Sequence, residues 1–142
     1  MEDKYQKYFA YGSNMSIEAL QVMGVKYKNV QPAILQNYVL VFDIPDLVKT
    51  EFGFANIKKN EGGIVKGLLM EISDSSWTIL DQYEGFPDDY LKEELVVELL
   101  GGKMVNCVVY IGNSVVLKDG LLPWPSHFEI VKQCHQKYFN GY

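Results

Sequence analysis

The chain of 142 residues is 48% hydrophobic and 22% charged, which is typical of a folded globular domain and unlike a disordered chain. We expect one domain spanning residues 1–142. The formal net charge of −5 argues against a nucleic-acid partner, and no apolar run approaches the ~18 residues that a membrane-spanning helix needs. The charged N-terminus lacks the apolar segment of a secretion signal, so we expect a cytoplasmic protein with no membrane partner.

The first predicted strand is the aromatic and apolar run Tyr8–Tyr11, which ends at Gly12. A helix of about two turns follows, capped by Asn14 or Ser16 and ended by Gly24. A strand that ends at a glycine and leads into a helix presents unpaired backbone N–H groups and the positive end of the helix dipole. Such a loop favours a carboxylate or a developing oxyanion. The simpler alternative is that Gly12 makes a turn and Asn14 caps the helix.

Strand patterns dominate the middle of the chain from Tyr27 onward. The predicted strands cover residues 31–43, 52–59, 62–72 and 94–112, the last segment being two strands joined by a two-residue turn at Gly101 and Gly102. Helical periodicity returns in residues 73–85 and 125–139, where Ser126 and Glu129 have the spacing of a capping box. These elements predict an α+β fold, a small and mostly antiparallel mixed β-barrel flanked by short helices. Closure of the barrel cannot be read from the pattern.

Glu84 shares a helical stripe with Trp77 and Leu80, which marks its carboxylate as inward facing. It also stands in the last turn before Gly85, where the negative end of the helix dipole disfavours a negative charge. Both placements would raise the pKa of Glu84, and such a glutamate can act as a base near neutral pH. The alternative is that the side chain extends from the edge of the stripe into water.

Acidic residues and histidines elsewhere show no metal-binding pattern. Asp88 and Asp89 lie in a proline-containing turn after Glu84, and their spacing does not favour a divalent metal ion. His127 and His135 are too far apart on the last predicted helix to share a ligand, so we expect surface or boundary positions for both.

The two cysteines, Cys107 and Cys134, lie in apolar segments without a metal-binding spacing. We interpret them as reduced core thiols. A nucleophile built from Cys107 and a histidine stays open as an alternative.

Four segments together resemble the γ-glutamyl cyclotransferases: YFAYGSN, GGIVKGLLMEI, LDQYEGFPDDY and VVYI. The similarity runs from Tyr8 to Tyr138, and its anchors are the YGSN loop and the helix-ending Glu-Gly followed by a tyrosine. The resemblance implies a small β-barrel flanked by helices, with the loop and Glu84 meeting at one cavity.

The resemblance also implies a reaction that needs no metal and no cofactor. The free α-amine of a γ-glutamyl group attacks its own γ-carbonyl, which gives 5-oxoproline and releases an amine, with Glu84 as proton acceptor and later donor. The implied substrate-binding residues are Tyr11, Gly12, Ser13, Asn14, Tyr90 and Tyr110. For the last two tyrosines, packing in the core is an equal alternative.

Phe128 departs from the family pattern, because relatives often place a tyrosine at the start of the last helix, and a hydroxyl contact with substrate would be lost. The expected partner is a small-molecule γ-glutamyl substrate, whose acceptor amine cannot be read from the sequence. Two other functions stay open: a γ-glutamyl hydrolase or acyltransferase on the same fold, and a non-catalytic module that binds a small carboxylate. A homodimer also stays open.

Overall fold

The computed structural model describes residues 3–140, so the ends of the expected domain, residues 1–2 and 141–142, lie outside the described residues. The strands are β1 (Tyr5–Ala10), β2 (Tyr27–Pro45), β3 (Phe52–Ser73), β4 (Tyr90–Leu99), β5 (Met104–Gly112) and the short β6 (Leu122–Pro123). The helices are α1 (Ile17–Met23), α2 (Trp77–Glu84) and α3 (Pro125–Tyr138), with 3-10 turns η1 (Ser13–Met15) and η2 (Asp74–Ser76). None of the described helices has the length and apolar content needed to cross a membrane.

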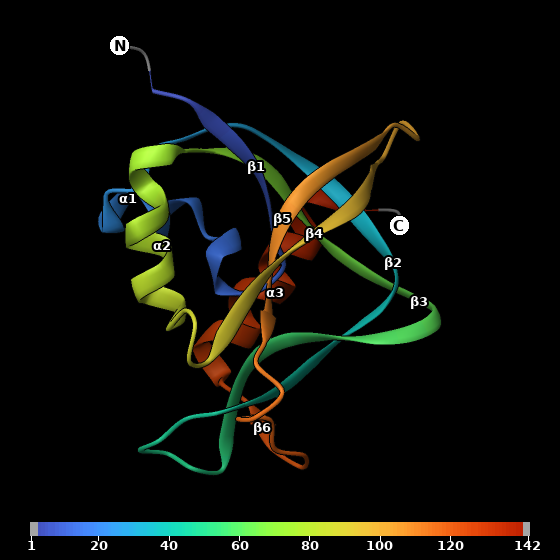
Figure 1. Ribbon diagram of the computed structural model, residues 1–142. Coiled ribbons are helices and arrows are strands. Elements are labelled where there is room, and N and C mark those ends of the chain that lie inside the picture. Colours follow the sequence, from blue (N-terminus) through green and yellow to red (C-terminus); the bar gives the residue numbers. More distant parts are fainter. Residues whose placement is uncertain (1–2, 141–142) are drawn as a thin grey trace.

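The first five strands close into a mixed barrel, which confirms the predicted fold class (Figure 1). Their order around the barrel is β1-β5-β4-β2-β3, and β1 completes the circle by pairing with β3 as well. Tyr8 is the residue of β1 that stands opposite both Met70 of β3, in an antiparallel pair, and Val108 of β5, in a parallel pair. The remaining pairings of the closed barrel are antiparallel.

β2 and β3 form one long, bent hairpin, where the sequence predicted two separate strands over 52–59 and 62–72. The bend lies at Asn37 and Gly62, which both have left-handed φ angles, of 67° and 82°. The N–H of Gly62 donates to Oδ1 of Asn37 at 3.2 Å, so the bulge is held by a hydrogen bond and the strand continues past it. Gly62, where the sequence predicted the start of a new strand, therefore lies at a bend inside one strand.

Two predictions about local structure are wrong. The connection between β4 and β5 spans residues 100–103 instead of the predicted two-residue turn, and Gly102 adopts a left-handed φ of 98° within it. The predicted capping box of Ser126 and Glu129 is not formed, because α3 begins with Pro125 in its first turn and no side chain caps its N-terminus. Proline suits this position since it has no N–H to leave unpaired.

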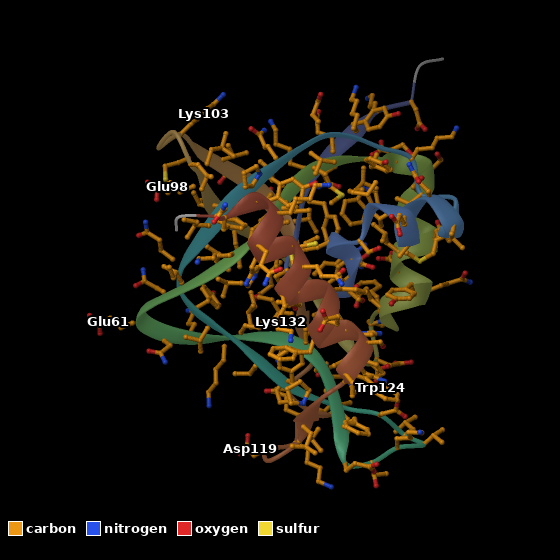
Figure 2. The ribbon with its side chains drawn as sticks, turned by 180° about the vertical axis from the view of Figure 1, so that it is seen from behind. Glu61, Glu98, Lys103, Asp119, Trp124 and Lys132 are labelled. Carbon is orange, nitrogen blue, oxygen red and sulfur yellow. The ribbon has the colours of Figure 1, made fainter. Side chains whose placement is uncertain are left out.

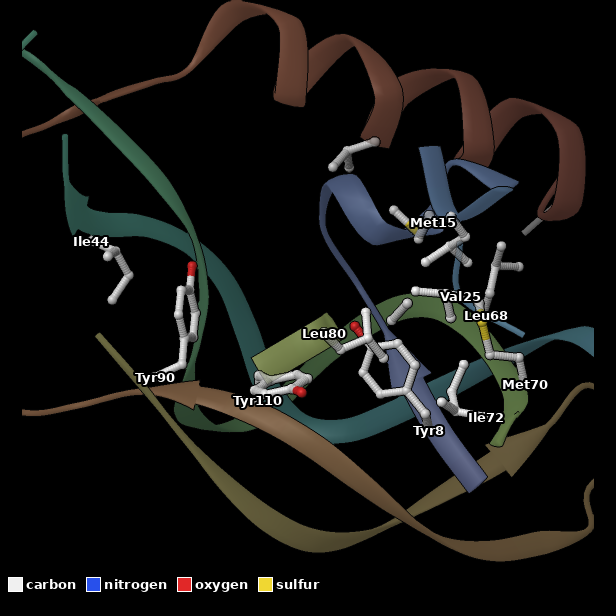
Figure 3. Close-up of a cluster of buried hydrophobic side chains, with 13 residues drawn as sticks. Tyr8, Met15, Val25, Ile44, Leu68, Met70, Ile72, Leu80, Tyr90 and Tyr110 are labelled. Atoms are coloured by element: carbon white, nitrogen blue, oxygen red, sulfur yellow. The ribbon is translucent and has the colours of Figure 1, made fainter. Parts of the chain in front are cut away.

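Buried side chains form two clusters, and residues of β1 alternate between them as strand geometry requires. Phe9 packs with Leu69 in one cluster, whereas its neighbour Tyr8 packs with Leu68 and Met70 in the other. Figure 3 shows the second cluster, which lies between the barrel strands and the helices. From behind, Figure 2 shows α3 lying across the barrel with Lys132 on its outer side. The helices thus cover one side of the barrel, and β1 links both clusters.

Candidate active site

A cavity of about 500 Å³ lies where the end of β1, the start of β4 and the end of β5 meet the last turn of α2 and the β2–β3 hairpin. All of the site residues expected from the sequence line it: Tyr11, Gly12, Ser13, Asn14, Glu84, Tyr90 and Tyr110. Its wall also contains residues that the sequence did not single out for this role, notably Tyr8, Asp46, Tyr83, Asp89 and His127. Figure 3 shows Tyr8, Tyr90 and Tyr110 from this lining.

The loop after β1 lines this cavity and contains backbone N–H groups without an acceptor among the described residues. β1 ends one residue earlier than predicted, so Tyr11 begins the loop. No described residue accepts a hydrogen bond from the backbone N–H groups of Gly12, Ser13 or Asn14. Gly12 lies close to β3, where an added Cβ would be 3.0 Å from the Cβ of Ala55. These N–H groups can receive an anionic oxygen of a bound molecule.

Ser16, and not Asn14, caps the following helix. Its hydroxyl accepts from the N–H of Ala19 at 3.2 Å, and Gly24 ends α1 with a left-handed φ of 83°. Both residues fulfil the roles expected from the sequence. Capping by Ser16 leaves the side chain of Asn14 for other contacts.

Glu84 is the last residue of α2, and Gly85 ends the helix in a left-handed conformation with φ 75°. Glu84 is partly buried as a residue, and its side chain lines the cavity. Burial raises the pKa of Glu84 from 4.5 to about 8, and a hydrogen bond from Asn14 opposes this rise. The carboxyl group can therefore exchange a proton near neutral pH.

Asn14 connects Glu84 to a tyrosine of the cavity wall. It is buried, and its Nδ2 donates to Oε1 of Glu84 at 2.5 Å and to the hydroxyl of Tyr8 at 3.1 Å. The described residues provide no hydrogen-bond partner for its Oδ1. They also provide none for Oε2 of Glu84, so this second carboxyl oxygen can contact a bound molecule.

The hydroxyl groups of the expected aromatic wall are bonded to protein atoms. Tyr11 donates to the backbone oxygen of Tyr110 at 2.6 Å, and Tyr90 donates to the backbone oxygen of Ala55 at 2.5 Å. Tyr110 itself donates to Oδ1 of Asp81 at 2.7 Å. Tyr90 and Tyr110 therefore belong to the buried core and also line the cavity, so the two alternatives expected for them do not exclude each other. Their fixed hydroxyls make them rigid walls.

The tip of the β2–β3 hairpin, residues 46–51, forms the outer wall. Oδ1 of Asp46 accepts from the N–H groups of Val48 at 2.8 Å and Lys49 at 3.1 Å, so the tip is held by its own hydrogen bonds. Leu47 lines the cavity although it is 90% exposed. The acidic lining residues are Asp46, Glu84 and Asp89, and no lysine or arginine of the described chain lines the cavity.

His127 is the residue of α3 that reaches the cavity, where its ring lies 5.3 Å from that of Phe54. Burial lowers the pKa of His127. Phe128 instead packs its ring against Phe42, at 5.8 Å between centroids, and does not belong to the cavity lining. Phe128 therefore lies outside this cavity.

Cys107 is buried in the cluster that contains Phe9, and it does not line the cavity. Burial raises the pKa of Cys107 to about 12, so the thiolate is disfavoured. Cys107 and Cys134 are both free cysteines. Within residues 3–140, no group of three or more His, Cys, Asp and Glu side chains could hold a metal ion.

Fold and site together define a small α+β barrel protein with a carboxyl group of raised pKa in the same cavity as a loop of unpaired backbone N–H groups. The family model described as gamma-glutamyl cyclotransferase, AIG2-like, matches residues 8–126. The chain belongs to this family, as the resemblance predicted.

Individual relatives agree with this assignment. A gamma-glutamylcyclotransferase of Bos taurus is 31% identical over 128 residues, a region that covers 87% of this chain and 66% of the bovine protein. A solved structure of a gamma-glutamyl cyclotransferase superposes with a TM-score of 0.81 at 24% identity, covering 96% of this chain and 82% of that chain. An uncharacterised protein of Homo sapiens gives the same TM-score of 0.81 at 25% identity, with 96% and 81% covered. The barrel is thus the fold of the solved relative.

Proposed function

We propose that the protein is a γ-glutamyl cyclotransferase in activity as well as in family. In the proposed reaction, the α-amine nitrogen of a γ-glutamyl amide bonds to the γ-carbonyl carbon, and the bond from that carbon to the acceptor nitrogen breaks. The products are 5-oxoproline and a free amine. Because nucleophile and electrophile belong to one molecule, the site has to fold the substrate and move protons.

Glu84 moves the protons in this proposal. The substrate's α-ammonium must become the lactam N–H, and the amide nitrogen must become an ammonium, so two protons pass from one nitrogen to the other. Glu84 accepts from the attacking nitrogen and donates to the leaving nitrogen, which restores its carboxylate at the end. Its raised pKa suits both directions, since the group then gains and loses a proton with similar ease near neutral pH.

The loop after β1 binds the charged oxygens of the substrate. Gly12, Ser13 and Asn14 line the same cavity as Glu84, and their N–H groups, from which no described residue accepts, are suited to the α-carboxylate or to the oxyanion that forms on the γ-carbonyl. Tyr11, Tyr90 and Tyr110 confine the γ-glutamyl group between rigid rings. A pure binding module would gain nothing from a desolvated carboxyl group at this position.

One observation carries the proposal: a single cavity holds a carboxyl group whose pKa is about 8 and a loop whose N–H groups no described residue accepts from. Family membership agrees with it.

The test is incubation with a panel of γ-glutamyl amino acids and amines, followed by mass spectrometry for 5-oxoproline. Glu84→Gln should lower turnover by at least about 10²-fold, the lower end of general acid-base contributions. Glu18→Gln, which changes a carboxylate of α1 outside the cavity, is the matched control. Free glutamate as product would mean hydrolysis, and a raised melting temperature without turnover would mean a binding module.

A further inference from the structure

The side chain of Asn14 lies between Glu84 and Tyr8 and forms a hydrogen bond with each of them. It stands in η1 with 3% of its surface exposed. One N–H of its amide points to Oε1 of Glu84 and the other to the hydroxyl of Tyr8, at 2.5 and 3.1 Å. The amide nitrogen is therefore fully used inside the protein, which leaves the backbone N–H as the remaining donor of Asn14.

The orientation of this amide has a chemical reason. Turned the other way, Asn14 would direct Oδ1 at the carboxyl group, and only a protonated Glu84 could donate to it. In the orientation observed, Oδ1 is buried without a partner among the described residues. Buried acceptors without partners are rare and call for an explanation. An N–H directed at the carboxyl group stabilises its ionised form, which is the form that a base requires.

Tyr8 fixes the second N–H of the amide. Its side chain is 3% exposed, and its ring makes edge contacts with Trp77 at 5.7 Å and Tyr110 at 5.8 Å between centroids. These rings hold the Tyr8 hydroxyl in place. Since it accepts from Asn14, the hydroxyl prevents the amide from rotating away from Glu84.

We infer that Asn14 is a positioning residue for Glu84: anchored by Tyr8, its amide holds one carboxyl oxygen and leaves the other oxygen for the attacking nitrogen of the substrate. The inference rests on the proposed function in taking Glu84 as the base. Tyr8 becomes part of the site through this chain of hydrogen bonds, although no sequence pattern distinguishes it from a core tyrosine.

A measurable property separates this role from a purely structural one. Burial raises the pKa of Glu84 and the Asn14 hydrogen bond lowers it, so loss of that bond must raise the pKa further. A hydrogen bond to a charged group corresponds to a shift of about one to two pH units. Loss of packing alone would not move the titration in this direction.

The experiment titrates the protein labelled with ¹³C at the glutamate side-chain carboxyl carbons, and Glu84→Gln identifies the signal of Glu84. Asn14→Leu and Tyr8→Phe are compared with Asn56→Leu. Asn56 is a matched control because it is 2% exposed and bonds to Asp43 and to the N–H of Gly112, with no contact to Glu84. The dependence of kcat/KM on pH for a γ-glutamyl amide is measured on the same variants.

We expect Asn14→Leu to raise the titration midpoint of Glu84 by about one pH unit or more. Tyr8→Phe should raise the titration midpoint by less. Asn56→Leu should lower the melting temperature without changing the titration midpoint of Glu84. The acid limb of kcat/KM should move with the midpoint. An unchanged midpoint in Asn14→Leu overturns the inference, and if that variant does not fold, an unchanged midpoint in Tyr8→Phe does so. Absence of turnover with a shifted midpoint would overturn the proposed function and the substrate part of the inference, but not the hydrogen-bond chain.

Discussion

Replacing Glu84 with glutamine should make the protein more stable at alkaline pH. Glutamine keeps the shape of the side chain and can accept from Asn14, but it never carries the charge whose burial raises the pKa of Glu84 from 4.5 to about 8. At about 1.4 kcal/mol per pH unit, this rise in pKa sets an upper limit of about 4 to 5 kcal/mol on the free energy of unfolding that is lost when Glu84 ionises in the folded protein.

The sign of the pH dependence follows from proton binding. Between pH 4.5 and about 8, the folded protein keeps a proton on Glu84 that the unfolded chain has released, so raising the pH favours the unfolded chain. Glu84 therefore gives a contribution to stability that is fully present below pH 4.5 and is lost as the pH rises through about 8. Glu84→Gln lacks this dependence.

Urea unfolding of both proteins at about pH 5, 7 and 9 measures how the free energy of unfolding depends on pH. The free energy of unfolding of Glu84→Gln should exceed that of the parent at the highest pH by several kcal/mol within the limit above, and the difference should be small at the lowest pH. Parallel curves for the two proteins would refute the reasoning, because they would mean that the Glu84 carboxyl is as well solvated in the folded protein as in the unfolded chain.

The loop, the outer part of the cavity and the buried thiol each give one further prediction. Gly12→Ala should lower kcat/KM by about tenfold or more, since its Cβ would lie 3.0 Å from that of Ala55 and displace the loop; steady-state kinetics check this, and an unchanged value contradicts it. Matched γ-glutamyl amides ending in an ammonium, a methyl or a carboxylate group should be turned over in falling order, by about fivefold overall, because Asp46 and Asp89 line the cavity. The opposite order in a 5-oxoproline assay would contradict this. Cys107, whose pKa burial raises to about 12, should resist iodoacetamide in the folded protein; alkylation seen by mass spectrometry before unfolding would contradict its burial.

Local sequence signals were sufficient to predict the main elements of the cavity. Glu84 could be singled out because Leu80 marks the inward face of its helix and Gly85 marks its end, and both signals are confirmed by the structure. Gly12 likewise indicated the loop. These signals depend on neighbours along the chain, which is why a single sequence contains them.

Features that depend on distant residues could not be predicted in this way. Closure of the barrel requires Tyr8 to pair with both Met70 and Val108, and no periodicity within β1 reveals two partners. The role of Tyr8 depends on Asn14 turning its side chain back toward β1. His127 reaches the cavity because of how α3 crosses the barrel, which its own sequence pattern does not determine.

The two ends of the β2–β3 hairpin differ in how they are held. Its strands pair within the barrel, whereas its tip is held by hydrogen bonds from the N–H groups of Val48 and Lys49 to Asp46. Residues 47–51 are exposed, and Leu47 among them lines the cavity. Under the proposed function, exchanging this segment between relatives should change which amine is preferred, while Glu84 and the loop after β1 stay the same.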